Sequence, residues 1–263
     1  MTSLPAGFAG VEVQLWLWLL AAIRPGAAFI AAPVFGAPQV PVQLRFVVAL
    51  AVGMPALATN AFVLPPEGIA SVAGFAIVIG EVLVGLALGF AVQIGLAAAL
   101  VAGETIGNAM GLGFAAMVDP MTNAQSGAIG QMLSILGTFL FLALGGHLIL
   151  ASIIVDSYRA LPPGSAWLGA GQVQGLLRFG GDVFAMGLAI ALPVGFAVVL
   201  VQLVMGMLAR SAPALNLFSV GLPAALLAGL ILLAIATPQM ADAITQGLLR
   251  GLDEARALSR GRG

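Results

Sequence analysis

The sequence predicts an all-α integral membrane protein of about six long helices that glycine and proline interrupt. Charge is rare: nine basic and ten acidic residues make up 7% of the 263 residues, against about 25% in soluble domains. The chain is also 61% hydrophobic, with a mean hydropathy of +1.14. A transmembrane helix needs roughly 20 apolar residues, and that length is reached by six uncharged runs: 25–44, 46–66, 82–103, 120–155, 183–209 and 211–241.

Composition also excludes several functions. Cysteine is absent, which excludes disulfides, thiolate catalysis and thiolate metal sites. The single histidine, His147, cannot form a histidine-rich metal site, and a hydrogen-bonded structural role suits it better than that of a ligand. A net charge of −1 argues against nucleic acid. Because no phosphate-cradling loop or catalytic set is recognisable, we expect a non-enzymatic protein without cofactor or metal.

The first two segments are expected over residues 11–34 and 42–58. Trp16 and Trp18 stand near the start of the first, as interface anchors do. No positive charge precedes Arg24, so the segment does not read as a cleavable signal peptide. The run 24–26, Arg-Pro-Gly, places a charge and an expected kink inside it.

The third segment, residues 69–103, would be about 50 Å long as a helix. That exceeds a hydrocarbon core of about 30 Å, so the helix should tilt, break or extend beyond the membrane. Glu81, Gly85 and Gly95 share a narrow arc at helical spacing, and Gly89 lies four residues after Gly85. Small residues so spaced allow close approach of helices. This face is therefore expected to pack on other helices.

The remaining segments follow an apolar, glycine-rich stretch at residues 104–126 that predicts a loop. We expect helices over 127–155, over 183–208 with a bend at Pro193, and over 219–236 with a break at Pro238. An amphipathic end then continues to residue 258. The arginine-rich tail, residues 250–263, should be cytoplasmic because positive charge favours that side.

Four charged residues lie within or beside apolar segments, namely Arg24, Glu81, Glu104 and Asp182. A charge in such a place is costly and usually faces a protein interior or a partner. Two interpretations stay open: structural pairing across helices, or a polar lining that takes part in transport or in a proton-coupled step. Arg178 and Asp182 stand four residues apart and could pair with each other.

A series of different short motifs follows one another along nearly the whole chain. Their order and spacing together are more specific than any one of them. They are Arg24-Pro25, Pro33-Val34-Phe35-Gly36, Gly80-Glu81, Gly103-Glu104, Gly111-Leu112-Gly113-Phe114, Asp119-Pro120, Gly146-His147-Leu148, Asp156-Ser157-Tyr158, Leu161-Pro162-Pro163-Gly164, and the stretch from Arg210 to Pro223. Together they resemble the FliR/SctT family of type III secretion export-gate proteins. One departure is that small apolar residues follow Pro223, where the family often has lysine.

The resemblance implies a single domain over residues 1–263 that joins a protein-conducting gate. Family members combine with FliP and FliQ in a helical hetero-oligomer of hairpins, recruit FlhB and work beside FlhA. The gate lies in the bacterial inner membrane at the flagellar basal body and is expected to project toward the periplasm. Unfolded export substrates pass through it. The runs at 80–85 and 216–221 favour the flagellar branch over the injectisome branch.

The resemblance also implies that the loop contributes a plug to the closed pore; without it, a tight interhelical turn is equally acceptable. Glycines would let the backbone adapt, and methionine and phenylalanine would supply soft apolar surface. The plug residues would be Gly107, Met110, Gly111, Gly113, Phe114, Met117 and Asp119. Two rival functions are a small-solute secondary transporter, which usually shows an internal repeat, and an intramembrane enzyme.

Overall fold

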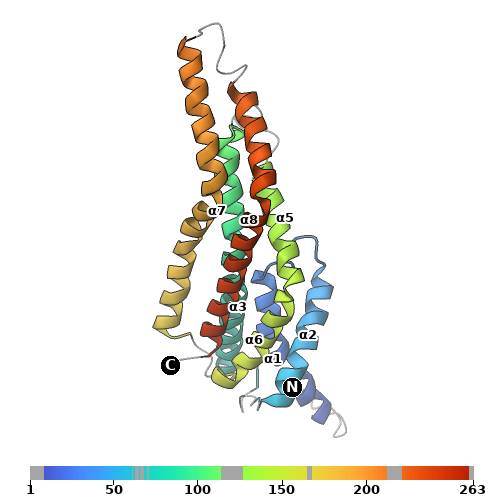
Figure 1. The fold of residues 1–263 in the computed structure, drawn as a ribbon. Coiled ribbons are helices and arrows are strands. Elements are labelled where there is room, and N and C mark those ends of the chain that lie inside the picture. The colour runs from blue at the N-terminus through green and yellow to red at the C-terminus, as the bar shows by residue number, and fades with distance from the viewer. Residues whose placement is uncertain are drawn as a thin grey trace. The chain divides into compact units, whose positions relative to one another are not determined.

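The computed structural model describes residues 9–60, 62, 65, 68–69, 71–113, 127–164, 168–211 and 221–260. Within these residues every regular element is a helix, which confirms the predicted all-α fold (Figure 1). The helices are α1 (Ala9–Ala31), α2 (Val42–Thr59), α3 (Val72–Ala109), α5 (Ala128–Ala143), α6 (Gly146–Ala160), α7 (Ala170–Ser211) and α8 (Leu222–Ser259).

The number of candidate membrane spans agrees with the predicted six. Among the described residues, five helices, α1, α2, α3, α7 and α8, are long and apolar enough to cross a bilayer, and α5 with α6 would make a sixth. The sequence predicted one helix over 127–155, but the structure ends α5 at Ala143 and begins α6 at Gly146. Gly145 between them has a φ of 66°, a left-handed conformation that interrupts a helix and that glycine adopts at no steric cost.

Helices α7 and α8 are longer than the sequence suggested. The fifth helix was expected from residue 183, but α7 begins at Ala170 and spans 42 residues. Arg178 and Asp182, which precede the expected start, are exposed on this helix, so they need not interrupt it. The break expected at Pro238 is also wrong, since α8 continues through it for 38 residues. Proline removes one hydrogen bond from the ladder, and membrane helices tolerate that loss.

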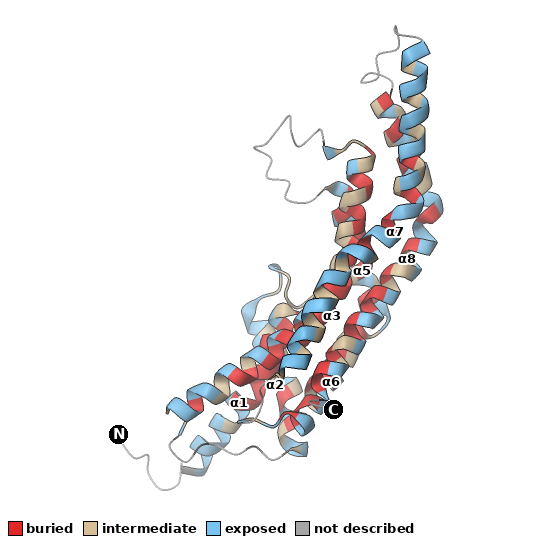
Figure 2. Cartoon of the chain, turned by 90° about the vertical axis from the view of Figure 1, so that its left-hand side faces the viewer, coloured by how far each residue is buried: buried red, intermediate tan, exposed pale blue. Residues whose placement is uncertain are grey.

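The chain divides into two compact units, each described by itself. The first comprises residues 1–94, 144–180 and 250–263, and the second residues 95–143 and 181–249. In the first unit, α1 packs on α2, and both contact α6. Its core includes Leu20, Phe29, Leu88, Leu150 and Ile154, all at most 1% exposed (Figure 2).

The second unit places three helices close together at glycine residues. A Cβ on Gly103 of α3 would lie within 2.7 Å of the backbone of Ile129 and Gly130 on α5. Likewise, Gly95 of α3 faces the backbone of Gly247 on α8. Backbones approach this closely only where no side chain intervenes.

Candidate functional site

A buried ion pair between Arg24 of α1 and Glu81 of α3 is the most polar feature inside the first unit. The guanidinium donates twice to the carboxylate, from Nε to Oε2 at 2.9 Å and from Nη2 to Oε1 at 2.8 Å. Both side chains are 0% exposed. The fork of arginine matches the two carboxylate oxygens in this arrangement, which is the strongest geometry for such a pair.

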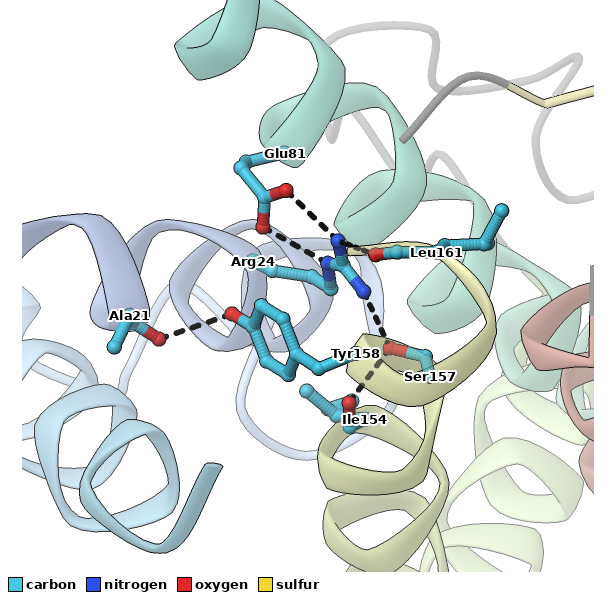
Figure 3. A network of polar contacts seen from close by, with 7 residues as sticks. All are labelled: Ala21, Arg24, Glu81, Ile154, Ser157, Tyr158 and Leu161. Atoms are coloured by element: carbon cyan, nitrogen blue, oxygen red, sulfur yellow. Dashed lines mark hydrogen bonds and ion pairs between the residues drawn. The ribbon is translucent and has the colours of Figure 1, made fainter. Parts of the chain in front are cut away.

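The other donors of Arg24 reach the end of α6 (Figure 3). Nη1 donates to the hydroxyl of Ser157 at 2.8 Å, and Nη2 also donates to the carbonyl of Leu161 at 2.7 Å. The guanidinium carbon lies 3.9 Å from the ring centroid of Tyr158, whose hydroxyl donates to the carbonyl of Ala21 at 3.1 Å. We call Ala21, Arg24, Glu81, Ser157, Tyr158 and Leu161 the Arg24 cluster.

The Arg24 cluster acts as a clamp, by which we mean that its polar contacts hold neighbouring helices together. Arg24 makes four hydrogen bonds and its charge is balanced by Glu81, so the cluster joins α1, α3 and the end of α6. No groups of histidine, aspartate and glutamate that could hold a metal ion occur among the described residues. The geometry favours pairing across helices over a polar pore lining. Sequence reasoning did not single out Ser157 or Tyr158, although they belong to the motif at 156–158.

Gly85 and Gly89 lie on the same side of α3, where α1 passes. A Cβ on Gly85 would overlap the carbonyl of Arg24, and one on Gly89 would overlap the carbonyl of Ala28. These backbone oxygens cannot move away as a flexible side chain could. The two glycines therefore bring α1 close enough for Arg24 to reach Glu81.

The other predicted charged residues do not join this cluster. Arg178 and Asp182 on α7 are both exposed. The described residues contain two ion pairs, Arg24–Glu81 and Arg256–Asp253, so Arg178 and Asp182 do not pair with each other. Glu104 lies on α3, and its side chain reaches the amino end of α5. Its carboxylate accepts a hydrogen bond from the backbone N–H of Gly127 at 2.6 Å, beside the positive end of the α5 dipole.

The first residues of the predicted plug lie at the end of α3, which continues to Ala109 rather than stopping near residue 103. Gly111 has a φ of 84°. The N–H of Leu112 donates to the carbonyl of Gly107, and that of Gly111 to Asn108, both at 3.0 Å. This is the Schellman motif, which ends a helix on a left-handed glycine. Gly113 follows directly, whereas Phe114, Met117 and Asp119 lie outside the described residues.

Other helices of the second unit hold this end of α3. Met110 is 0% exposed, and its side chain fills the space beside Gly229 of α8. From α7, the amide of Gln202 donates to the carbonyl of Ala109 at 2.5 Å. The α3 end is therefore fixed before the chain enters the loop.

Long apolar helices, a buried cross-helix ion pair and glycine contacts between backbones define a multi-pass helical membrane protein. Within the described residues, the Arg24 cluster is where polar side chains join several helices. Residues 15–250 match the family described as bacterial export proteins, family 1, and the chain belongs to this family. This confirms the resemblance to the FliR/SctT family. The members of this family are membrane components of protein export.

Several relatives carry the name flagellar biosynthetic protein FliR. The chain is 33% identical to that of Escherichia coli over 231 residues, which cover 87% of this chain and 86% of the relative. Identity to the Pectobacterium carotovorum protein is 38% over 64% of each chain. The Bacillus subtilis protein is 29% identical over 83% of this chain and 85% of its own length.

Proposed function

We propose that the chain is a subunit of the flagellar type III export gate. In this proposal it forms, with FliP and FliQ homologues, the protein-conducting pore of the bacterial inner membrane. FlhB and FlhA are the further partners, and unfolded flagellar proteins are the cargo. Family membership and the names of the relatives support an export role. The observation that carries the role of a gate subunit is the open apolar face of α7.

The lengths of the helices support partners beyond the lipid. At about 1.5 Å per residue, the 38 residues of α3 and the 42 of α7 would be about 57 Å and 63 Å long. A hydrocarbon core of about 30 Å covers roughly half of such a helix. The uncharged part of α7, residues 183–209, would by itself be about 40 Å long, so protein should cover the apolar part that lies outside the hydrocarbon core. A projection toward the periplasm would satisfy this need.

The exposed face of α7 has the pattern of a helix-docking surface. Phe184, Phe196 and Met207 are 69%, 62% and 71% exposed, and Figure 2 shows long exposed stretches on this helix. At about 100° per residue, Gly181, Gly195 and Gly206 fall within about 40° of one another. A Cβ on any of the three would meet nothing within 4 Å. We call these three glycines the α7 glycine line.

A line of glycines with open space beside them, set between large exposed apolar side chains, suits a helix better than lipid. Lipid gains nothing from a missing side chain, whereas a second helix can bring its backbone into the gap. The α7 glycine line therefore supports docking of an apolar partner helix. Partners of the FliP or FliQ type would supply such helices.

We propose that residues 107–119, which comprise the capped end of α3 and the start of the loop, help to seal the closed pore as a plug. The two ends of the loop are tied together, because Glu104 before the loop binds the N–H of Gly127 after it. The capped end of α3 fixes the first of these ends. A loop held by a rigid stem can fill a pore and move aside without unfolding its support.

Co-purification tests the gate. The full chain, with an affinity tag, is expressed with FliP and FliQ homologues from the same genome, and the recovered partners are quantified. Gly195→Leu should reduce their recovery at least tenfold, because its side chain would enter the helix contact. Gly171→Leu is the matched control: it lies on the same helix with open space around it, about 80° or more from the α7 glycine line, and should retain both partners.

Recovery of the wild-type chain without partners, together with transport of a small solute in liposomes, would overturn the gate and favour a secondary transporter. Association with homologues from an effector-secretion gene cluster would instead assign the injectisome branch. The plug has its own test. Deleting residues 111–117 should raise the resting ion conductance of cells carrying the assembled gate, and an unchanged conductance would count against the plug.

A further inference from the structure

An apolar groove lies between α1, α2 and α3 in the first unit and has a volume of about 540 Å³. Among the described residues, twelve line it: eleven are apolar, and the twelfth is Arg45 of α2. A second groove of about 500 Å³ adjoins it, since both include Leu19 and Phe46. Trp16 and Trp18 line the second groove, and Glu12 is the one charged residue among its described lining residues.

Arg45 presents an unfilled hydrogen-bonding edge beside this groove. Its Nη2 donates to the carbonyl of Ala37 in the turn between α1 and α2, at 2.7 Å. Its Nε is buried and has no hydrogen-bond partner. A buried donor left unpaired is unfavourable, and more so where the group is charged. An acceptor is therefore missing at this position.

Arg24 shows which acceptor would complete the arrangement. In both arginines Nη2 donates to a turn carbonyl, that of Leu161 for Arg24 and that of Ala37 for Arg45. In Arg24 the Nε–Nη2 edge also holds the carboxylate of Glu81. In Arg45 the same edge has no anion. The amino end of α2 adds to the attraction, because no side chain caps it and its dipole favours negative charge.

The dimensions of the groove suit acyl chains. Flexible hydrocarbon fits such a space, and volumes of about 300–1,000 Å³ are typical of small-molecule sites. The apolar lining offers no hydrogen bond except at Arg45, which stands three residues after the start of α2, where a polar headgroup would lie at the membrane surface.

We propose that this groove binds an anionic phospholipid, with its phosphodiester on the Nε–Nη2 edge of Arg45 and its acyl chains along α1 and α2. Arginine holds phosphate oxygens in a bidentate manner as it does carboxylates. Because no acidic side chain is among the described lining residues of the first groove, this lining has a net positive charge. It should therefore prefer phosphatidylglycerol to phosphatidylcholine, whose ammonium group would bring a second positive charge. The site is independent of the proposed export function.

Fluorescence quenching tests this site, with Trp16 and Trp18 as reporters in the adjoining groove. The full chain carrying Trp167→Phe, which removes the third tryptophan, is reconstituted in phosphatidylcholine vesicles. Phosphatidylglycerol with brominated acyl chains, which quench nearby tryptophan, is then titrated in and compared with brominated phosphatidylcholine. Quenching should show a preference of about fivefold for the anionic lipid, as one partly buried charge pair would provide.

Arg45→Gln should abolish the preference, and Arg45→Lys, which keeps the charge but not the fork, should leave part of it. Arg210→Gln is the matched control, because it removes one exposed arginine from the end of α7 and should keep the full preference. Circular dichroism checks that the helices persist, and Arg45→Lys serves if Arg45→Gln does not fold. Equal quenching by both lipids in the wild type would overturn the proposal and assign the edge of Arg45 to an acidic side chain of a partner subunit. A preference that persists in Arg45→Gln would also overturn it.

Discussion

Replacing Glu81 by glutamine should destabilise the protein strongly, because the guanidinium of Arg24 would then be buried without a counter-charge. The amide has nearly the shape of the carboxylate but can accept at only one end. Its NH₂ group would face one of the two donors that now bind Oε1 and Oε2. The substitution therefore removes one hydrogen bond and the whole charge balance.

The magnitude follows from the complete burial of both side chains. Breaking one partner of a buried pair typically costs 3–5 kcal/mol. The bonds from Arg24 to Ser157 and Leu161 remain, so we place the loss at the lower end, about 3 kcal/mol. Since about 1.4 kcal/mol corresponds to a factor of ten, the ratio of folded to unfolded protein should fall roughly 100-fold.

Titration with dodecyl sulfate in mixed micelles, followed by circular dichroism, measures this loss. Tyr158→Phe is the matched control within the cluster. It removes only the hydroxyl that donates to Ala21 and keeps the ring beneath Arg24, so it should cost about 1 kcal/mol. The double variant Arg24→Met with Glu81→Leu should recover much of the stability, because apolar residues often replace a buried pair at little cost.

A loss below about 1 kcal/mol for Glu81→Gln, or a double variant that is no more stable than Glu81→Gln, would refute the clamp. The same variant separates the two interpretations of Glu81 in cells. Lost assembly with its partners supports a structural role. Intact assembly with lost export supports a working role in transport.

Three further predictions concern single positions. Gly89→Ala should lower the free energy of unfolding by about 1–3 kcal/mol, because its Cβ would overlap the carbonyl of Ala28. In the same titration, Gly195→Ala, whose Cβ would lie in open space, should leave the free energy of unfolding unchanged or raise it by up to about 1 kcal/mol. Glu104→Ala should lower the stability of the start of α5 by about 1 kcal/mol, seen as faster amide exchange there, while unchanged exchange would contradict the contact with the loop end. Gly111→Ala should cost about 1 kcal/mol, because alanine resists the left-handed conformation of this cap, and full stability by thermal unfolding would argue against the cap.

The helical composition of the protein could be predicted closely from local pattern. Uncharged runs of membrane length predicted the spans. The first helix was expected over residues 11–34, and α1 ends close to that prediction, at Ala31. Interruptions were harder to predict. Pro238, where a break was expected, lies inside the continuous helix α8, whereas Gly145, which the sequence did not single out, separates α5 from α6. Local propensity indicates how much proline destabilises a helix, but the packing around the helix decides whether the helix continues through it.

The candidate site was only partly foreseeable. Arg24 and Glu81 stood out because charge is rare in apolar segments, and both lie in one buried cluster. Their partner Tyr158 did not, since an aromatic residue at a helix end has no distinctive pattern. For Arg178 and Asp182, helical spacing suggested a pair that the structure does not contain among its described ion pairs. On an exposed helix, water or a partner can solvate each charge separately.

The sequence by itself determined the solvent in which this protein folds and the helical form of its chain, because both depend on the character of successive residues. Tertiary structure decided which distant residues meet: Arg24 with Glu81, 57 positions apart, and Glu104 with Gly127 at the two ends of the loop. Such meetings depend on how closely backbones approach, as at Gly85 and Gly89. That distance is set by the packing of whole helices, which no short pattern contains.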